Sequence, residues 1–342
     1  MGIDDMQTLP RLLNPELPVD TTEKRIFILM ACYNGARYLE EQIRSIQGQR
    51  FANWRLIARD DGSKDDTVEI IERFARMDSR IALFQDDYGN LGPIGNFSAL
   101  IAHALQENAG YVFLADQDDR WHADKLGLML AGMFELERQA SGKPCLVHCD
   151  LAVVDAQLNV TAPSFTKHVG LVPAEASLGI LLRQNQVTGC ACLVNRQALE
   201  LAYPVPPAVF MHDWWLALLC AATGKIGYIA QSLVDYRQHG NNVMGAVSYW
   251  RRLFRLLTSL DRWRFQAQTV KRGIRQAGAV LDRIKTSGQS FHPAAMEQLS
   301  IYATILDVFP ASRQRVLEQY ELCDPAWTAN LLFKALMLCM RR

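Results

Sequence analysis

The sequence predicts an α/β fold in which helices flank a mostly parallel, doubly wound sheet, with a helical region at the C-terminal end. Within residues 25–139, short apolar runs alternate with amphipathic stretches of helical period, which is typical of parallel strands joined by crossover helices. Residues 249–342 show helical periodicity and no strand pattern. The chain therefore divides into three predicted parts: a leader at residues 1–23, an α/β domain at residues 24–245 and a helical region at residues 246–342.

The first half of the α/β domain contains four predicted strands and four predicted helices. The apolar runs that we expect to be strands are residues 25–31, 54–59, 81–85 and 111–115. The amphipathic stretches that we expect to be helices are residues 38–47, 65–77, 94–107 and 123–139. Ser63 precedes the second of these helices and is a candidate for its N-cap.

The second half alternates less regularly. Further strands are expected at residues 145–154, 186–194 and 225–229, and a nearly all-apolar helix at residues 213–222. No uncharged apolar run of about 18 residues is present, and the N-terminus lacks a basic-then-apolar signal pattern. We therefore expect that the chain does not span a membrane by itself.

The composition limits the classes of partner. With 342 residues, of which 49% are hydrophobic, the chain can bury a sizeable core. Its 36 basic and 36 acidic residues give a formal net charge of zero, so no nucleic-acid partner is expected. The eight cysteines lie mostly in apolar runs without a CxxC pair, which favours buried thiols in a reducing cytoplasm over zinc ligands.

Three carboxylates follow the strand predicted at residues 111–115: Asp116, Asp118 and Asp119. In open α/β sheets, ligands bind at the carboxyl ends of such strands. Carboxylates at this place favour a hard cation that carries a diphosphate. The alternative is an acidic turn that only caps the next helix.

A second acidic pair, Asp60 and Asp61, follows the second predicted strand, and Asn34 and Gly35 follow the first. All of these residues are expected to face one cleft, where one carboxylate accepts from a base or ribose and another holds a metal at the phosphates. The alternative for Asp60 and Asp61 is a turn followed by a helix cap.

Two motifs in the second half add candidates. In His212-Asp213-Trp214-Trp215, a carboxylate beside two indoles is expected to have a raised pKa, which suits a general base, although an N-cap role is the alternative. In the motif at residues 235–242, Arg237 and His239 suit contact with a diphosphate, and His239 also suits a metal. A single histidine is more often structural.

Several of these segments resemble a known family. Residues 31–46, the run at 60–67, and Asn90-Leu91-Gly92 with Asn96-Phe97 resemble family 2 inverting glycosyltransferases, which have a GT-A fold. The forms of residues 116–121, 212–215 and 236–242 resemble the rhamnosyltransferase-like branch, which builds bacterial surface polysaccharide. The resemblance covers about residues 25–245.

The resemblance implies a role for most of the candidate residues. The nucleotide-sugar contacts that it implies are Asn34, Asp60, Asp61, Asp116, Arg237 and His239, with Asp60 at the base or ribose and Asp61 supporting that loop. Asp118 would be the main metal-contacting carboxylate, with Asp116 beside the sugar and metal, and Asp213 would be the catalytic base. Arg237 and His239 would lie near the diphosphate. Two positions depart from the family pattern: His212 replaces a usual glutamate, and Ala123 replaces a frequent proline.

The resemblance also implies a reaction. The expected enzyme uses Mg or Mn and moves a sugar, with rhamnose the first candidate, from a nucleotide-diphosphate donor to a glycan or polyprenyl-linked acceptor. Arginines and large apolar residues interleave at residues 249–257, 262–264 and 331–342. These segments either contact the cytoplasmic face of a membrane or simply pack on the α/β domain.

Two other functions compete with this interpretation. A nucleotidyltransferase would carry a glycine- and lysine-rich phosphate loop after the first strand, and residues 33–37 are not one. A non-catalytic nucleotide-sugar-binding module of a membrane assembly complex would bind donor without turnover.

Overall fold

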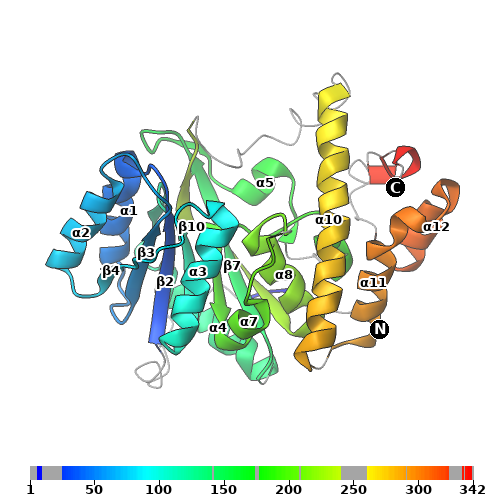
Figure 1. The fold of residues 1–342 in the computed structure, drawn as a ribbon, viewed down its shortest axis with the longest axis horizontal. Coiled ribbons are helices and arrows are strands. Elements are labelled where there is room, and N and C mark those ends of the chain that lie inside the picture. Colours follow the sequence, from blue (N-terminus) through cyan, green and yellow to red (C-terminus); the bar gives the residue numbers. More distant parts are fainter. Residues whose placement is uncertain are drawn as a thin grey trace.

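The protein is described by a computed structural model that covers residues 6–9, 25–140, 142–173, 177–207, 209–239, 260–289, 291–322, 333–334 and 336–340. A central sheet has the strand order β1-β10-β7-β9-β5-β2-β3-β4, and helices cover both of its faces (Figure 1). Along this order, neighbouring strands pair in parallel except at β9, which is antiparallel to both β5 and β7. Two short strands outside this order, β6 and β8, pair antiparallel with β10 and β7. The predicted α/β class and mostly parallel sheet are therefore confirmed.

The first half of the domain follows the prediction closely. Its strands are β2 (Arg25–Cys32), β3 (Arg55–Asp60), β4 (Ile81–Leu83) and β5 (Ala109–Asp116). Its helices are α1 (Ala36–Gln47), α2 (Thr67–Met77), α3 (Gly92–Gln106) and α4 (Lys125–Ala140). The Ser63 cap was wrong, because α2 begins after Asp66 and the Ser63 hydroxyl bonds to the carboxylate of Asp60 instead.

The second half departs more from the prediction. Its remaining elements are β6 (Arg120–Trp121), β7 (Cys145–Val154), β8 (Val160–Ala162), α5 (Phe165–Val169), α6 (Leu178–Arg183), η3 (Gly189–Ala191), β9 (Cys192–Asn195), α7 (Arg196–Ala202), α8 (His212–Thr223) and β10 (Lys225–Arg237). The strand expected at residues 186–194 is only partly present, because the backbone turns through η3 before β9 begins. β10 runs on to Arg237, well beyond the expected end.

One strand was not predicted. β1 (Met6–Thr8) lies in the segment that we expected to be a leader, and it pairs in parallel with β10. Leu9, which follows it, is buried in the core. Three residues are too few to show a strand period in the sequence.

The two faces of the sheet carry separate cores. Phe27 and Leu29 of β2 face the core built with α3, α7 and α8, while Ile26 and Ile28 face the core built with α1, α2 and α4. Because both faces are covered, successive residues of the central strands are all apolar, and this explains the unbroken runs in the sequence.

The C-terminal part is helical, as predicted: α10 (Leu260–Ser287), α11 (Pro293–Ala303), η4 (Ile305–Asp307) and α12 (Pro310–Gln319). Figure 1 shows α10 standing beside α8, and Arg283 of α10 donates to the carbonyl oxygens of Leu201, Tyr203 and Pro204. The proposed boundary near residue 245 lies outside the described residues.

The candidate membrane segments are only partly described. Residues 249–257 lie outside the described part of the chain. Of the last segment, Phe333, Leu336, Met337 and Met340 are buried against the core, while Leu338 is 49% exposed. Among the described residues, no helix combines the length and the apolar character needed to cross a bilayer.

Candidate active site

The strand register brings the two acidic clusters together. Cys32 at the end of β2 lies opposite Asp60 of β3, and its neighbour Ala31 lies opposite Asp116 of β5. The two carboxylates therefore flank the carboxyl end of the same central strand. Both carboxylates were predicted from the sequence to lie at this edge of the sheet.

The loop after β2 is tied to both neighbouring loops. Asn34 has a left-handed backbone with φ of 48°, and its Oδ1 accepts from the backbone N of Lys64 at 2.8 Å. The backbone N of Asn34 donates to Ser63 Oγ at 2.7 Å. On the other side, Gln117 Oε1 accepts from Tyr33 N at 2.8 Å and Gln117 Nε2 donates to Tyr33 O at 3.0 Å. Asn34 thus shapes the rim of the site through its own loop.

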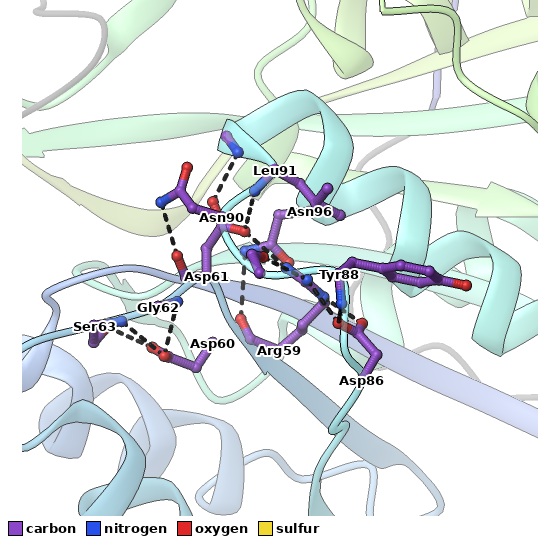
Figure 2. Close-up of polar contacts among 12 residues, drawn as sticks. Arg59, Asp60, Asp61, Gly62, Ser63, Asp86, Tyr88, Asn90, Leu91 and Asn96 are labelled. Carbon is purple, nitrogen blue, oxygen red and sulfur yellow. Dashed lines mark hydrogen bonds and ion pairs between the residues drawn. The ribbon is translucent and has the colours of Figure 1, made fainter.

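Asp60 organises the turn that follows β3. Its Oδ2 accepts from the backbone N of Gly62 at 3.0 Å and of Ser63 at 2.8 Å, and its Oδ1 accepts from the Ser63 hydroxyl (Figure 2). The turn that was the alternative for Asp60 is therefore present in the structure. Its partly exposed carboxylate retains lone pairs that a ligand can use.

Asp61 is buried and joins β3 to the loop before α3. Its Oδ1 accepts from Arg59 NH1 at 2.8 Å and from Leu91 N at 2.7 Å, and its Oδ2 accepts from Gly92 N at 2.8 Å (Figure 2). Arg59 also forks onto Asp86, with Nε at 2.7 Å and NH2 at 2.9 Å from its two oxygens. Asp61 is therefore a structural anchor of the loop that closes one side of the site.

The acidic run after β5 is crowded. Burial, together with the negative charges of Asp118 and Asp213, raises the pKa of Asp116 to about 7. Burial, together with the negative charges of Asp118 and Asp116, raises the pKa of Asp119 well above its ordinary value. Asp116, Asp119 and Cys190 place ligand atoms within 4.8 Å of one another. Such a concentration of carboxylates is stabilised when a cation binds it.

A buried lysine lies beneath this run. Lys125, at the start of α4, donates from Nζ to the carbonyl oxygen of Cys190 at 2.6 Å and lies 3.2 Å from the centre of the Trp121 ring. Burial lowers its pKa to about 8. Its positive charge opposes the rise in the pKa of Asp116.

The two predicted diphosphate contacts differ in their surroundings. His239 Nε2 lies 2.8 Å from Asp118 Oδ2, and both side chains remain about 15% exposed (15% and 16%). The Arg237 side chain is 1% exposed, and it donates to Asp118 O at 2.8 Å, Ala156 O at 2.7 Å and Glu41 Oε2 at 2.5 Å. The His239–Asp118 pair is therefore partly accessible at the site. The buried Arg237 side chain instead holds the loop after β5 through its bond to the Asp118 carbonyl oxygen.

Asp213 occupies the first turn of α8 and is buried. Its Oδ1 accepts from Asn185 Nδ2 at 3.1 Å and from Trp214 N at 2.6 Å, and its Oδ2 accepts from Gly189 N at 3.0 Å. Burial raises its pKa to about 6, while these hydrogen bonds oppose the rise. The predicted raised pKa is confirmed, although the main cause is burial as a whole rather than the two indoles alone.

His212 behaves differently from the glutamate that it replaces. Its ring stacks on Phe97 with centroids 3.9 Å apart, and burial lowers its pKa to about 3. The imidazole is therefore neutral at physiological pH and carries no charge into the site.

Some residues of the site were not predicted. Gln117 lies between Asp116 and Asp118, and its uncharged amide does not stand out among the carboxylates. Gly189 lies in the strand expected at residues 186–194, Asn185 just before it, and Lys125 in the helix expected at residues 123–139, and none of them carried a signal for the site. Their contribution depends on contacts between distant parts of the chain.

Comparison with known proteins agrees with this geometry. Residues 27–144 match the family model of glycosyl transferase family 2. The dTDP-rhamnosyl transferase RfbG of Shigella flexneri is 26% identical over 244 residues, which cover 68% of this chain and 80% of that protein. The UDP-Glc:alpha-D-GlcNAc-diphosphoundecaprenol beta-1,3-glucosyltransferase WfgD of Escherichia coli is 31% identical over 110 residues, covering 32% of this chain and 41% of that protein.

A solved structure supports the fold. The mannosyltransferase PcManGT of Pyrobaculum calidifontis, solved with GDP-Man and Mn²⁺, superposes with a TM-score of 0.50 at 16% identity, covering 91% of this chain and 79% of that one. Residues 27–144 thus match a family 2 glycosyltransferase domain, and the predicted GT-A fold is confirmed.

Proposed function

We propose that this protein is an inverting glycosyltransferase that moves a sugar from a nucleotide-diphosphate donor to a hydroxyl group of a glycan or polyprenyl-linked acceptor. The observation that carries the proposal is the convergence of Asp60 and Asp116 on the end of β2, with the carboxylate of Asp213 near enough to raise the pKa of Asp116. Donor carboxylates and a base of raised pKa thus belong to one site.

The donor end of the site is built by three strand ends. Asp60 would accept from the base or ribose, with Asn34 and Asp61 holding the loops around it. Asp116 would lie beside the sugar. RfbG is named for dTDP-rhamnose, which makes this donor the first candidate.

The residues present fit a divalent cation. Asp118 and His239 form a partly exposed carboxylate–imidazole pair beside the crowded carboxylate of Asp116. Mg²⁺ and Mn²⁺ prefer carboxylate oxygens, and the imidazole adds a nitrogen donor. Asp118 would be the principal ligand, with His239 beside it. When bound, the cation would neutralise negative charge on the diphosphate leaving group.

Asp213 would act as the general base. Its carboxylate would take the proton of the acceptor hydroxyl while that oxygen bonds to the anomeric carbon and the bond from that carbon to the diphosphate oxygen breaks. One displacement inverts the configuration, and the nucleoside diphosphate leaves with the electron pair. With a pKa of about 6, Asp213 is mostly ionised at pH 7 and more basic than an ordinary aspartate.

A relative and the chemistry of its acceptor support a proposal for the acceptor and the cellular location. WfgD is named for a diphosphoundecaprenol-linked acceptor, and an acceptor of this type would place the protein in the cytoplasm, at the inner face of a membrane. The interleaved arginines and large apolar residues at 249–257 and 262–264 would then supply the peripheral contact, because Phe333, Leu336, Met337 and Met340 of the last segment are buried against the core.

The test is nucleotide release from a donor panel of dTDP-rhamnose, UDP-glucose, UDP-galactose and GDP-mannose, with Mg²⁺, with Mn²⁺ and with EDTA. Metal-dependent release from one donor that is lost in Asp118→Ala is the expected result. With the acceptor supplied, Asp213→Asn should lower turnover by roughly 100- to 10,000-fold at nearly unchanged donor affinity, as removal of a general base does.

The matched control is Asp282→Asn, the same substitution at an exposed position of α10. It should keep wild-type turnover. An Asp213→Asn enzyme that also keeps wild-type turnover would show that Asp213 is not the base. Donor binding without turnover in the wild type, for every donor and metal, would favour the non-catalytic interpretation.

A further inference from the structure

Asn185 lies between α6 and η3, and its side-chain amide has a fixed orientation. Its Oδ1 accepts from the backbone N of Val187 at 3.0 Å, and its Nδ2 donates to Asp213 Oδ1 at 3.1 Å. Because a backbone N–H can only donate, the carbonyl oxygen of the amide must face Val187. The amino group is therefore the end that faces Asp213.

The other two donors to Asp213 are backbone groups, Gly189 N and Trp214 N. Any residue other than proline carries the same backbone N–H. Among the three described donors, Asn185 is thus the one whose chemistry depends on the side chain.

Two contacts fix the position of the segment that carries Asn185 and Gly189. Lys125 Nζ binds the carbonyl oxygen of Cys190, next to Gly189 in the chain. A Cβ added to Gly189 would lie 2.9 Å from His212 Nε2, so the backbone here approaches α8 closely. This turn therefore connects the buried lysine beneath the acidic run with the carboxylate on α8.

We infer that Asn185 is a positioning residue for the general base: its amide donor fixes the rotamer of Asp213 and holds the carboxylate in its ionised form. The inference rests on the proposed role of Asp213. An N–H donor stabilises a carboxylate relative to the carboxylic acid, and it also occupies one lone pair, which leaves the remaining lone pairs aimed at the acceptor hydroxyl.

Among the described residues, the titratable groups near Asp213 include Asp116 at the end of β5, Cys192 of β9 and its neighbour His212, whose Nε2 lies on the same side of Gly189 as the Asp213 carboxylate. Burial lowers the pKa of His212 to about 3 and raises the pKa of the Cys192 thiol far above neutrality, so both stay uncharged between pH 5 and 9. Asp116 titrates in the same range and interacts electrostatically with Asp213, so the acidic limb belongs to the pair rather than to either residue. The described side-chain hydrogen bond of Asn185 runs to Asp213, so a difference between variant and wild type arises at the Asp213 end of that pair.

The experiment is the pH profile of kcat/KM for Asn185→Asp and Asn185→Ala. The aspartate keeps the shape of the side chain and the bond from Val187, but it places a carboxylate oxygen where the amino group faced Asp213. Two carboxylates at this distance do not both ionise readily, so the acidic limb should move up by about one pH unit or more. Asn185→Ala removes the donor without adding charge, and its limb should move in the same direction by less.

The matched control is Asn159→Asp. The Asn159 amide also donates to an aspartate, Asp155 Oδ2 at 2.9 Å, but on an exposed turn after β7. Its pH profile should match that of the wild type. Urea unfolding of each variant at pH 8 establishes that the folded fraction is the same.

An acidic limb that stays in place in both Asn185 variants, even with lower kcat, would overturn the inference and leave Asn185 a structural residue. This outcome is distinct from failure of the proposed function. If the proposed function fails, Asp213→Asn itself keeps wild-type turnover. If only this inference fails, Asp213 remains essential for turnover, and its dependence on Asn185 is refuted.

Discussion

The substitution Gly35→Ala provides a sharp test of how the donor site is shaped. Gly35 precedes α1 with φ of −102°, a backbone conformation that alanine accepts readily. A Cβ at this position would lie 2.1 Å from Gln117 Oε1 and 2.4 Å from its Cδ, which is far inside van der Waals contact. The alanine therefore displaces the Gln117 side chain without straining its own backbone.

The consequence follows from what Gln117 holds. Its amide makes two hydrogen bonds to the main chain of Tyr33, at 2.8 Å and 3.0 Å. Each hydrogen bond contributes about 0.5–1.5 kcal/mol. Their loss therefore destabilises the ordered conformation of the loop after β2 by about 1–3 kcal/mol. Because both bonds are exposed to solvent, water replaces them in the free protein, and the unfolding free energy should change by less than about 1 kcal/mol. Donor binding must then restore the loop, which should weaken affinity by roughly 5- to 100-fold.

The assay is calorimetric titration with the donor identified by the release panel, together with urea unfolding. Gly127→Ala is the matched control, since a Cβ there meets nothing within 4 Å and Gly127 lies within α4. It should leave affinity unchanged and raise stability by roughly 0.5–1 kcal/mol. Gln117→Ala should reproduce the defect of Gly35→Ala, and the double variant should be no worse than either. A Gly35→Ala protein that binds donor within about twofold of wild type would refute the reasoning.

Two further predictions concern stability. Arg59→Met leaves the buried carboxylate of Asp61 without its cation and should cost about 3–5 kcal/mol in urea unfolding. The exposed Arg76→Met, which breaks only an i,i+4 pair with Glu72, should cost less than about 1 kcal/mol, and equal costs would contradict the argument. Burial lowers the pKa of His148 to about 3, so below the unfolded-state pKa of about 6.5 the unfolded chain binds a proton that the native state does not. Wild-type stability should therefore fall relative to His148→Phe by about 1.4 kcal/mol per pH unit as the pH drops, or about 2 kcal/mol at pH 5, and a gap that does not change with pH would refute this.

The first half of the fold could be predicted because each of its signals is local. The run from Arg25 to Cys32 is apolar at nearly every position because both faces of β2 are covered, and the amphipathic period of α1 follows it directly. Parallel connection then places Asp60 and Asp116 at one edge of the sheet by topology alone. These parts of the site needed no knowledge of distant contacts.

Other features arise from pairing between segments far apart in the chain. β1 is a strand because β10 offers it a free edge, and its three residues carry no period of their own. β9 begins only at Cys192, since the preceding η3 turn is fixed by Lys125 and packs against His212. No local pattern encodes either of these contacts.

The sequence by itself determined the fold class, the family and the set of carboxylates, because residue type and spacing decide where strands end and which charges follow them. Only the tertiary structure decided what each side chain contacts. It enclosed Arg237 beneath the acidic loop, left the His239–Asp118 pair partly exposed, made His212 neutral and placed Asn185 against Asp213. Burial and hydrogen-bond partners set these properties, and both depend on residues that lie far away in the chain.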